Sequence, residues 1–396
     1  MGPMTGPQRR TARLGRALER AISEGHPWIW RDALRDLDAA PGDVVTVRDR
    51  KGRFLCRGLA DGGPIGVRVW TTRDEPLDDA LLRRRVEAAA ALRSRARPDE
   101  TDCYRLVHGE GDRMPGMVCD VYGAHAVLRL DGAGIARWRD SLVRALIPVL
   151  ESLGGRSLLL RGARRERAHR ETLWGDAPEM PIEVREHGMR LLADLWQGQK
   201  TGLFLDHRES RRRVRGLCGG LRVLNLYGYT GGFSIAAGLG GAHAVETVDV
   251  AEPALDLARR GWTLNGLPEE GHRTHEEDVP EFLEATRRRG VRFDLIVSDP
   301  PSFAPRESAL KSALASYRKL HAACLALLEP GGVYLAASCS SHVRREAFER
   351  TVLEGARAGD RVLQVLSRWG APPDHPRLLA FPEGDYLKVL LARVSD

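Results

Sequence analysis

Residues 221–233 read Leu-Arg-Val-Leu-Asn-Leu-Tyr-Gly-Tyr-Thr-Gly-Gly-Phe, an apolar run followed by a glycine-rich turn. We expect a strand over Leu221–Leu226 and a helix that begins at Phe233. Further apolar runs predict strands at Ala244–Val248, 272–276, Phe293–Ser298 and Val333–Ala337, with helices between them. This alternation predicts an α/β domain with a doubly wound, Rossmann-like parallel sheet over residues 189–396.

The glycine turn matches neither the dinucleotide fingerprint nor the P-loop pattern. S-adenosylmethionine carries no phosphate and needs only close backbone approach, which Gly228, Gly231 and Gly232 permit. Asp249 ends the second strand, where an acidic side chain can accept both ribose hydroxyls, and Asp278 could accept from the adenine amine. We therefore expect S-adenosyl-L-methionine as cofactor, with a binding set of Asn225, Tyr227, Gly228, Tyr229, Thr230, Gly231, Gly232, Phe233, Asp249, Asp278 and Asp299.

Two short segments follow the last two of these strands: Asp299-Pro300-Pro301-Ser302-Phe303 and Ser338-Cys339-Ser340. If the strands are parallel neighbours, their ends lie about 5 Å apart. A thiolate at Cys339 could then add to C6 of a pyrimidine and let C5 take a methyl group from a sulfonium donor. Asp299 would hold the N3/N4 edge of the base. Amine methyltransferases carry a similar Pro-Pro-aromatic turn without a thiol, so that reaction stays an alternative.

The rest of the chain predicts two smaller domains. Short strands at Val44–Val47, Phe54–Leu59 and Ile65–Trp70 indicate a β-barrel module over residues 1–75, in which a helical stripe from Leu14 to Ile22 precedes the strands. A linker helix and a central α+β domain are expected over residues 76–188.

The composition of the chain limits the classes of partner that we expect. A net charge of +7 and a pI near 9.3 favour polyanions, although only five of the 61 basic residues are lysines, so codon bias is an alternative source of the charge. The six cysteines show neither a zinc spacing nor a disulfide framework, and we expect no metal. No apolar run approaches the ~20 residues of a membrane span, so we expect a soluble, cytoplasmic protein without a membrane partner.

Several segments resemble the RlmI-like family of large-subunit (23S) ribosomal RNA cytosine-C5 methyltransferases. Gly25-His26-Pro27-Trp28 and Pro41-Gly42-Asp43-Val44 are similar to the family's PUA domain, an RNA-binding module, and Tyr104-Arg105-Leu106-Val107 to its central domain. Residues 199–208, Gln-Lys-Thr-Gly-Leu-Phe-Leu-Asp-His-Arg, resemble the entry to its methyltransferase domain. Residues 381–388, Phe-Pro-Glu-Gly-Asp-Tyr-Leu-Lys, resemble its C-terminal signature.

The resemblance implies an S-adenosylmethionine-dependent enzyme in which Cys339 is the nucleophile and Asp299 binds the base. The donor or RNA side of the site would then include Lys200, Phe204, Asp206, Arg208, Pro300, Pro301 and Phe303. Related enzymes with the same Asp-Pro-Pro-x-Phe turn methylate guanine N7, and a non-catalytic RNA-binding assembly factor is a third option. The modified nucleotide, the base that removes the C5 proton and the choice between monomer and homodimer stay open.

Overall fold

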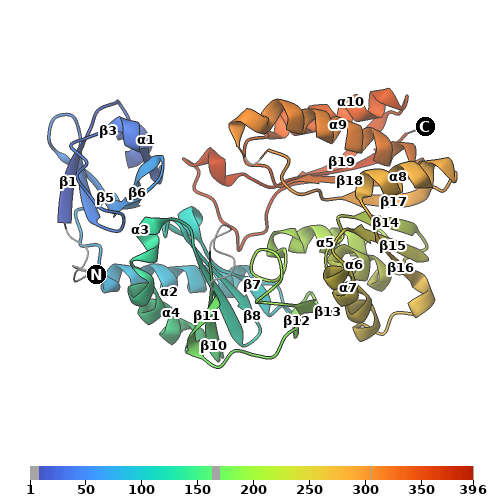
Figure 1. The fold of residues 1–396 in the computed structure, drawn as a ribbon, viewed down its shortest axis with the longest axis horizontal. Helices are drawn as coiled ribbons and strands as arrows, with labels where there is room; N and C mark the ends of the chain where they lie inside the picture. The colour runs from blue at the N-terminus through green and yellow to red at the C-terminus, as the bar shows by residue number, and fades with distance from the viewer. Residues whose placement is uncertain (1–8, 163–169, 305, 396) are drawn as a thin grey trace. The chain divides into compact units, whose positions relative to one another are not determined.

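The computed structural model describes residues 9–162, 170–304 and 306–395 (Figure 1). The chain forms two compact units. The first comprises Met1–Pro98, Asp102–Glu179 and Pro373–Gly384; the second comprises Asp99–Thr101, Met180–Pro372 and Asp385–Asp396. This division follows compactness alone, so the domain boundaries expected at residues 75 and 188 stay predictions.

The N-terminal part of the first unit is a six-stranded, nearly closed barrel-like sheet with the strand order β2-β6-β5-β4-β1-β3. Apolar side chains from its strands, among them Val45, Val47 and Val67, fill the interior of the sheet. The elements are β1 (Arg9–Leu14), α1 (Glu19–Ser23), β2 (Trp28–Trp30), η1 (Arg31–Ala33), β3 (Leu34–Arg35), β4 (Val44–Arg48), β5 (Phe54–Ala60) and β6 (Ile65–Thr71).

The helical stripe expected from Leu14 to Ile22 is wrong at its start. Residues 9–14 form β1, which pairs in parallel with β4, and helix α1 begins only at Glu19. Burial alternates along β1: Ala12 and Leu14 are buried, whereas Thr11 and Arg13 are exposed. A period of two is typical of a strand, and pairing with β4 overrides a local spacing that also suits a helix.

The remainder of the first unit is a five-stranded sheet with the order β11-β10-β9-β8-β7. The pairs β7–β8 and β8–β9 are antiparallel, as the alternating pattern predicted. Helices α2 and α4 pack on this sheet through a core that includes Leu82, Val86, Leu106 and Leu142. The elements are α2 (Asp79–Ala96), β7 (Cys103–His108), η2 (Gly109–Asp112), β8 (Met117–Tyr122), β9 (His125–Leu130), α3 (Ala133–Ala136), α4 (Arg139–Ser152), β10 (Ser157–Arg161) and β11 (Arg170–Gly175).

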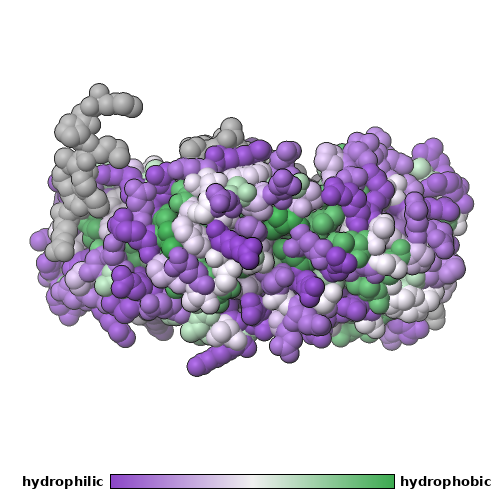
Figure 2. Space-filling model, turned by 90° about the horizontal axis from the view of Figure 1, so that it is seen from below, coloured by the Kyte–Doolittle hydropathy of each residue, from purple (hydrophilic) through white to green (hydrophobic). Residues whose placement is uncertain are grey.

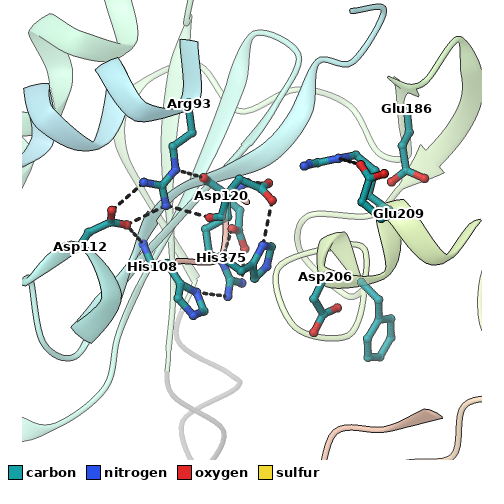
Figure 3. Close-up of polar contacts among 12 residues, drawn as sticks. Arg93, His108, Asp112, Asp120, Glu186, Asp206, Glu209 and His375 are labelled. Atoms are coloured by element: carbon teal, nitrogen blue, oxygen red, sulfur yellow. Dashed lines mark hydrogen bonds and ion pairs between the residues drawn. The ribbon is translucent and has the colours of Figure 1, made fainter. Parts of the chain in front are cut away.

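A buried polar network ties residues 373–384 into this unit (Figure 3). The Arg93 guanidinium donates to both carboxylate oxygens of Asp112, at 2.6 and 2.7 Å, and to the Asp374 carbonyl oxygen at 2.8 Å. The Asp374 carboxylate in turn accepts from the Arg105 backbone N–H at 3.0 Å. Since the Arg93 side chain is only 2% exposed, helix α2, η2 and the segment from 373 share one desolvated ion pair.

Arg93→Ala should lower the free energy of unfolding by about 3–5 kcal/mol, because it leaves the buried Asp112 carboxylate without its cation. Denaturant unfolding followed by circular dichroism measures this. The matched control is Arg95→Ala on the exposed face of the same helix, which should change stability by no more than about 0.5 kcal/mol. Equal unfolding midpoints for the two variants would show that the network contributes nothing.

The second unit contains a seven-stranded sheet in the order β16-β15-β14-β17-β18-β20-β19, together with the hairpin β12–β13. The first five strands of that order are parallel, and β17 pairs with β18 so that Ser298 lies opposite Ala336. The predicted neighbouring parallel strands are therefore confirmed. The strands are β12 (Ile182–Glu186), β13 (Met189–Ala193), β14 (Arg222–Leu226), β15 (Ala244–Asp249), β16 (His272–Glu276), β17 (Phe293–Ser298), β18 (Leu328–Ser338), β19 (Leu363–Trp369) and β20 (Lys388–Val394).

Helices cover both faces of this sheet. Two neighbouring residues of β14 point to opposite faces of the sheet. Val223 belongs to the core that α5, α6 and α7 form on one face, and Leu224 to the core that α8, α9 and α10 form on the other. This is the doubly wound arrangement that the sequence predicts. The helices are η3 (Leu205–His207), α5 (Arg208–Arg215), α6 (Gly232–Leu239), α7 (Glu252–Leu264), η4 (Glu269–Gly271), α8 (Val279–Arg288), η5 (Glu307–Ala309), α9 (Leu310–Ala326), α10 (Arg345–Ala358) and η6 (Pro382–Gly384), the last within the first unit.

One edge of the sheet departs from the expected parallel pattern. Strand β20 runs antiparallel to both β18 and β19, and it inserts between them. Antiparallel neighbours need no helical crossover, so the chain passes from β19 to β20 through residues 370–387 without a helix that packs back on the sheet. This insertion places Lys388 directly opposite Ser338.

The surface in Figure 2 is mostly hydrophilic, with apolar residues in scattered patches between charged and polar ones. Across the described ranges 9–162, 170–304 and 306–395, every helix is too short or too polar to span a lipid bilayer.

Candidate active site

A cavity lies in the second unit at the C-terminal ends of strands β14, β15, β17 and β18. Ligands bind at this edge in open α/β sheets, because the strand-to-helix turns diverge there. Of the residues expected from sequence, those that line the cavity are Lys200, Phe204, Asp206, Tyr227, Gly228, Tyr229, Thr230, Gly232, Phe233, Asp249, Asp299, Pro300, Pro301 and Cys339. The cavity thus brings together residues from five separate segments of the chain.

The turn after β14 forms one end of the cavity and has an unusual backbone. Tyr227, Tyr229 and Gly231 all have positive φ, at 57°, 49° and 72°. Gly228 has no room for a side chain, since a Cβ there would lie 2.3 Å from the Thr247 methyl carbon. Positive φ costs a non-glycine residue free energy and is concentrated at functional sites. The turn therefore presents its backbone to the cavity at some cost to stability.

Asp249 supports this turn from the end of β15. Its carboxylate accepts the Tyr229 backbone N–H at 2.9 Å and the Ala251 N–H at 3.0 Å. The side chain is 9% exposed and lines the cavity, so the carboxylate lies fixed at the wall. Each oxygen of the Asp249 carboxylate has two lone pairs, so the carboxylate can still accept hydrogen bonds from hydroxyl groups such as those of a ribose. The glycine turn and Asp249 fit the nucleoside half of S-adenosylmethionine.

The two turns that carry Asp299 and Cys339 are held together by hydroxyl groups. Ser302 Oγ and Ser340 Oγ lie 3.1 Å apart, and the Tyr317 hydroxyl contacts Ser338 Oγ at 2.9 Å and Ser340 Oγ at 3.1 Å. The serines that flank Cys339 are buried, so their polarity serves this hydrogen-bonded joint. The joint fixes the carboxylate turn and the thiol turn in one wall of the cavity.

Cys339 differs from the other cysteines of the chain. It is partly exposed and lines the cavity, whereas the other five are buried: Cys56, Cys103, Cys119, Cys218 and Cys324. Burial raises the pKa of the Cys339 thiol to about 11, and the nearby Asp299 carboxylate acts in the same direction, whereas Lys200 and Lys388 oppose it. The thiol is thus accessible and protonated near neutral pH.

His207 is a cavity residue that was not among the predicted site residues, although it lies inside the quoted segment 199–208. Its Nε2 lies 3.2 Å from Asp299 Oδ2, and its Nδ1 lies 3.2 Å from Ser210 Oγ. Trp369 Nε1–H donates to the same Ser210 oxygen at 2.9 Å. The imidazole is 2% exposed and orients the Asp299 carboxylate. His207 stands between Asp206 and Arg208 in the chain, and this local sequence carries no signal of a contact with Asp299, 92 positions away.

Residues 199–206 form another wall of the cavity. The Tyr229 hydroxyl donates to the Gly202 carbonyl and accepts the Gln199 N–H at 2.6 Å, which fastens this segment to the turn after β14. Lys200 Nζ lies 2.7 Å from Asp206 Oδ2 and 4.4 Å from the centre of the Phe204 ring. The Lys200 charge is therefore already paired at the cavity wall.

Five predicted residues do not line the cavity. Asn225 is buried and donates to Ser234 Oγ at 2.8 Å, and Gly231 packs against Ala258. Asp278 is exposed at the start of α8. Arg208 is fully buried, and the Phe303 ring packs 4.8 Å from that of Tyr317. The roles expected for these five residues stay predictions. Conversely, Leu191, Gln199, Leu203, Arg211 and Val250 complete the lining without having been predicted.

Comparison with known proteins agrees with this geometry. The sequence profile of the S-adenosylmethionine-dependent methyltransferase family matches residues 135–393, and that of the PUA-like domain matches residues 13–72. A structure of an S-adenosylmethionine-dependent methyltransferase from Streptococcus mutans aligns with a TM-score of 0.87 over 97% of this chain and 100% of that one, at 24% identity. A second structure with the same TM-score is a methyltransferase complexed with SAH.

Fold and site together define a class I methyltransferase that uses S-adenosylmethionine. Relatives that match over nearly the full length of the chain identify the family within this class. The "Ribosomal RNA large subunit methyltransferase I" of Salmonella arizonae is 35% identical over 96% of both chains, and a "Ribosomal RNA large subunit methyltransferase" of Deinococcus radiodurans is 37% identical over 99% of both. The chain belongs to this family of ribosomal RNA large subunit methyltransferases.

Asp249→Ala should weaken S-adenosylmethionine binding by about 1.5–3 kcal/mol, because hydrogen bonds to a charged acceptor are lost. Isothermal titration calorimetry with the donor and with S-adenosylhomocysteine measures the change. Asp256→Ala, an exposed carboxylate on α7, is the control and should bind both ligands as the wild type does. Unchanged affinity in Asp249→Ala would place the ribose hydroxyls elsewhere.

Proposed function

We propose that the protein methylates large-subunit ribosomal RNA, and that it transfers the methyl group of S-adenosylmethionine to C5 of a cytosine through a covalent adduct with Cys339. The observation that carries this proposal is the shared cavity. The single accessible thiol among the described cysteines lies in the same cavity as Asp299, the glycine turn and Asp249. Relatives named for activity on ribosomal RNA support the substrate class.

Methyl transfer to C5 of cytosine requires a thiolate, a methyl donor and a group that holds the base. C5 of cytosine is a weak nucleophile, and addition of the Cys339 thiolate to C6 turns C5 into an enamine carbon. The donor, when bound, supplies an electrophilic methyl group on a sulfonium. After C5 takes this methyl group, a base removes the C5 proton, and the C6–S bond breaks to release the thiolate. Asp299, oriented by His207, would hold the N3/N4 edge so that N3 stays protonated during the addition.

Other residues take supporting roles in this proposal. Pro300 and Pro301 shape the turn beside the base, and Phe303 braces it through Tyr317. Lys200, Phe204 and Asp206 line the wall that would face donor or RNA. The barrel-like sheet matched by the PUA-like profile would contribute RNA affinity, consistent with the net charge of +7.

A second candidate is methylation of guanine N7 or an exocyclic amine in the same cavity. It is favoured by one observation: burial raises the pKa of the Cys339 thiol to about 11, so the protein alone holds little thiolate. Direct transfer to a nitrogen lone pair needs no thiolate. The two candidates therefore differ in whether Cys339 is required.

Cys339→Ala should abolish methyl transfer to ribosomal RNA, since no other group can form the bond to C6, and it should leave donor binding intact. Transfer of a radiolabelled methyl group to unmodified 23S RNA measures the first, and calorimetry the second. Cys218→Ala and Cys324→Ala, both at buried thiols, should remain active. Methylation by Cys339→Ala at a rate near wild type would contradict the C5 mechanism and favour methylation of guanine N7 or an exocyclic amine.

An RNA that carries 5-fluorocytosine at the target gives an independent test of the adduct. Fluorine replaces the C5 proton, so elimination stops and the RNA stays bonded to the enzyme. Denaturing gel electrophoresis should show the wild-type adduct and none with Cys339→Ala. An active enzyme that forms no adduct would contradict the covalent step.

Binding to ribosomal RNA fragments should weaken steeply with salt, because arginine contacts to phosphates release counterions. The expected log–log slope is about −0.7 per phosphate contact on a single strand. Fluorescence anisotropy across a salt series measures this slope. Binding independent of salt would assign the basic composition to codon bias instead.

A target cytosine locked in a duplex should be methylated poorly, since stacking hides C6 from the thiol.

A further inference from the structure

Lys388 is a buried cation whose described contacts include no carboxylate. It begins β20, is 1% exposed, and its ammonium donates to the backbone carbonyls of Ser340 and Tyr386, each at 2.7 Å. Within residues 9–162, 170–304 and 306–395, no carboxylate oxygen lies within ion-pair distance of its Nζ. A buried charge without a counter-ion is costly to maintain, so its partner is expected to be a group that becomes anionic when the enzyme works.

The ammonium sits against the turn that carries Cys339. Lys388 pairs with Ser338 across the β18–β20 ladder, and its side chain reaches the Ser340 carbonyl. Both contacts are to residues adjacent to Cys339 in the chain, so the ammonium lies beside the turn that carries the thiol. The Tyr317 hydroxyl contacts both flanking serines, but burial raises its pKa to about 12, so the Cys339 thiol is the more acidic of the two groups.

The electrostatics of the pair are reciprocal. Burial lowers the pKa of Lys388 to about 8; Cys339 is the leading influence that raises this pKa, followed by Asp385, whereas Arg345 lowers it. For Cys339, burial and then Asp299 and Asp206 raise the pKa, and Lys200 and Lys388 lower it. Lys200 is already paired with Asp206 at 2.7 Å. Of the two lysines, Lys388 is thus the one without a carboxylate at ion-pair distance among the described residues, although Asp385 acts on it from farther away.

We propose that Lys388 is a positioning residue for the nucleophile: its ammonium is the counter-ion of the Cys339 thiolate. The Lys388–Cys339 pair loses one proton to solvent, and the sulfur keeps the electron pair. The resulting ammonium–thiolate form exchanges with the amine–thiol form, which holds the same number of protons. The use of this thiolate in methyl transfer rests on the function proposed above, whereas the ion pair itself is a property of the protein without RNA.

The pH dependence of thiol alkylation tests the ion pair directly. Iodoacetamide forms an S–CH2 bond with the thiolate and releases iodide. The other five cysteines are 0% exposed, so Cys339 is the expected site, to be verified by mass spectrometry. The wild-type rate should rise in two steps as the pH increases, and the lower step should report the fraction of the pair in the ammonium–thiolate form.

Lys388→Gln and Lys388→Arg separate charge from hydrogen bonding. Gln keeps donors for the carbonyls and lacks the charge, so the lower step should vanish and alkylation at pH 8.5 should slow at least about tenfold, the equivalent of one pKa unit. Arg retains the cation and should retain the accelerated reaction. Lys319→Gln, at an exposed lysine on α9 that does not line the cavity, is the control and should keep the lower step. A lower step that persists in Lys388→Gln would overturn the proposal.

Folding of each variant is checked by calorimetry with S-adenosylhomocysteine, because Lys388 does not line the cavity. A second measurement needs no lysine variant. The chain has only five lysines, so selective ¹³Cε labelling gives a spectrum in which Lys388 can be assigned. Its titration should spread over two steps in the wild type and collapse to one step at or below about pH 8 in Cys339→Ala. Identical titrations in both proteins would show that the two groups do not interact.

The two proposals fail in different ways. If Lys388→Gln alkylates as the wild type does, the ion pair is wrong, whatever the RNA substrate. If the ion pair is present but Cys339→Ala still methylates RNA, the covalent C5 mechanism is wrong. If both hold, Lys388→Gln should also lose kcat at neutral pH without loss of donor affinity, and Lys388→Arg should restore part of it.

Discussion

The parallel pairing of β17 with β18 is the constraint on which the site depends. Because Ser298 lies opposite Ala336, the turns that follow both strands emerge at the same edge of the sheet. The Ser302–Ser340 contact and the Tyr317 hydroxyl then fix those turns to each other. A shift of one residue in this register would turn successive side chains to the opposite face of the sheet and separate the carboxylate from the thiol.

The site is built at the expense of local stability. Tyr227 and Tyr229 adopt positive φ in the turn after β14, which costs each about 1–3 kcal/mol. Hydrogen bonds hold the strained turn in place: Asp249 accepts the Tyr229 N–H, and the Tyr229 hydroxyl joins residues 199–202. The same contacts that offset the strain also shape the cavity wall, so the backbone is arranged for a ligand before one arrives.

Buried charges anchor the chain where it passes between β19 and β20. Residues Pro373–Gly384 belong to the first unit, where Arg93 holds the Asp374 carbonyl, and the chain rejoins the second unit at Asp385. Tyr386 then donates to Asp206 Oδ2 at 2.8 Å, and Lys388 reaches the turn around Cys339. Tyr386, two residues before β20, and Lys388, its first residue, thus both contact residues at or beside the cavity, although neither lines it.

Sequence by itself determined the alternation of strands and helices, the glycine turn, and the acidic residue that ends β15, because each depends on local spacing and residue chemistry. It also singled out Cys339 and Asp299, since strand ends are legible as the last residue of an apolar run. It misassigned the start of the helical stripe expected from Leu14, which ends strand β1, because parallel pairing with β4 outweighs a local helical spacing. Two contacts join residues that are distant along the chain: His207 with Asp299, and Lys388 with the turn around Cys339. The burial of Arg208 depends on the direction of its side chain. Only the tertiary structure decided them, because packing selects which polar side chains face a cavity.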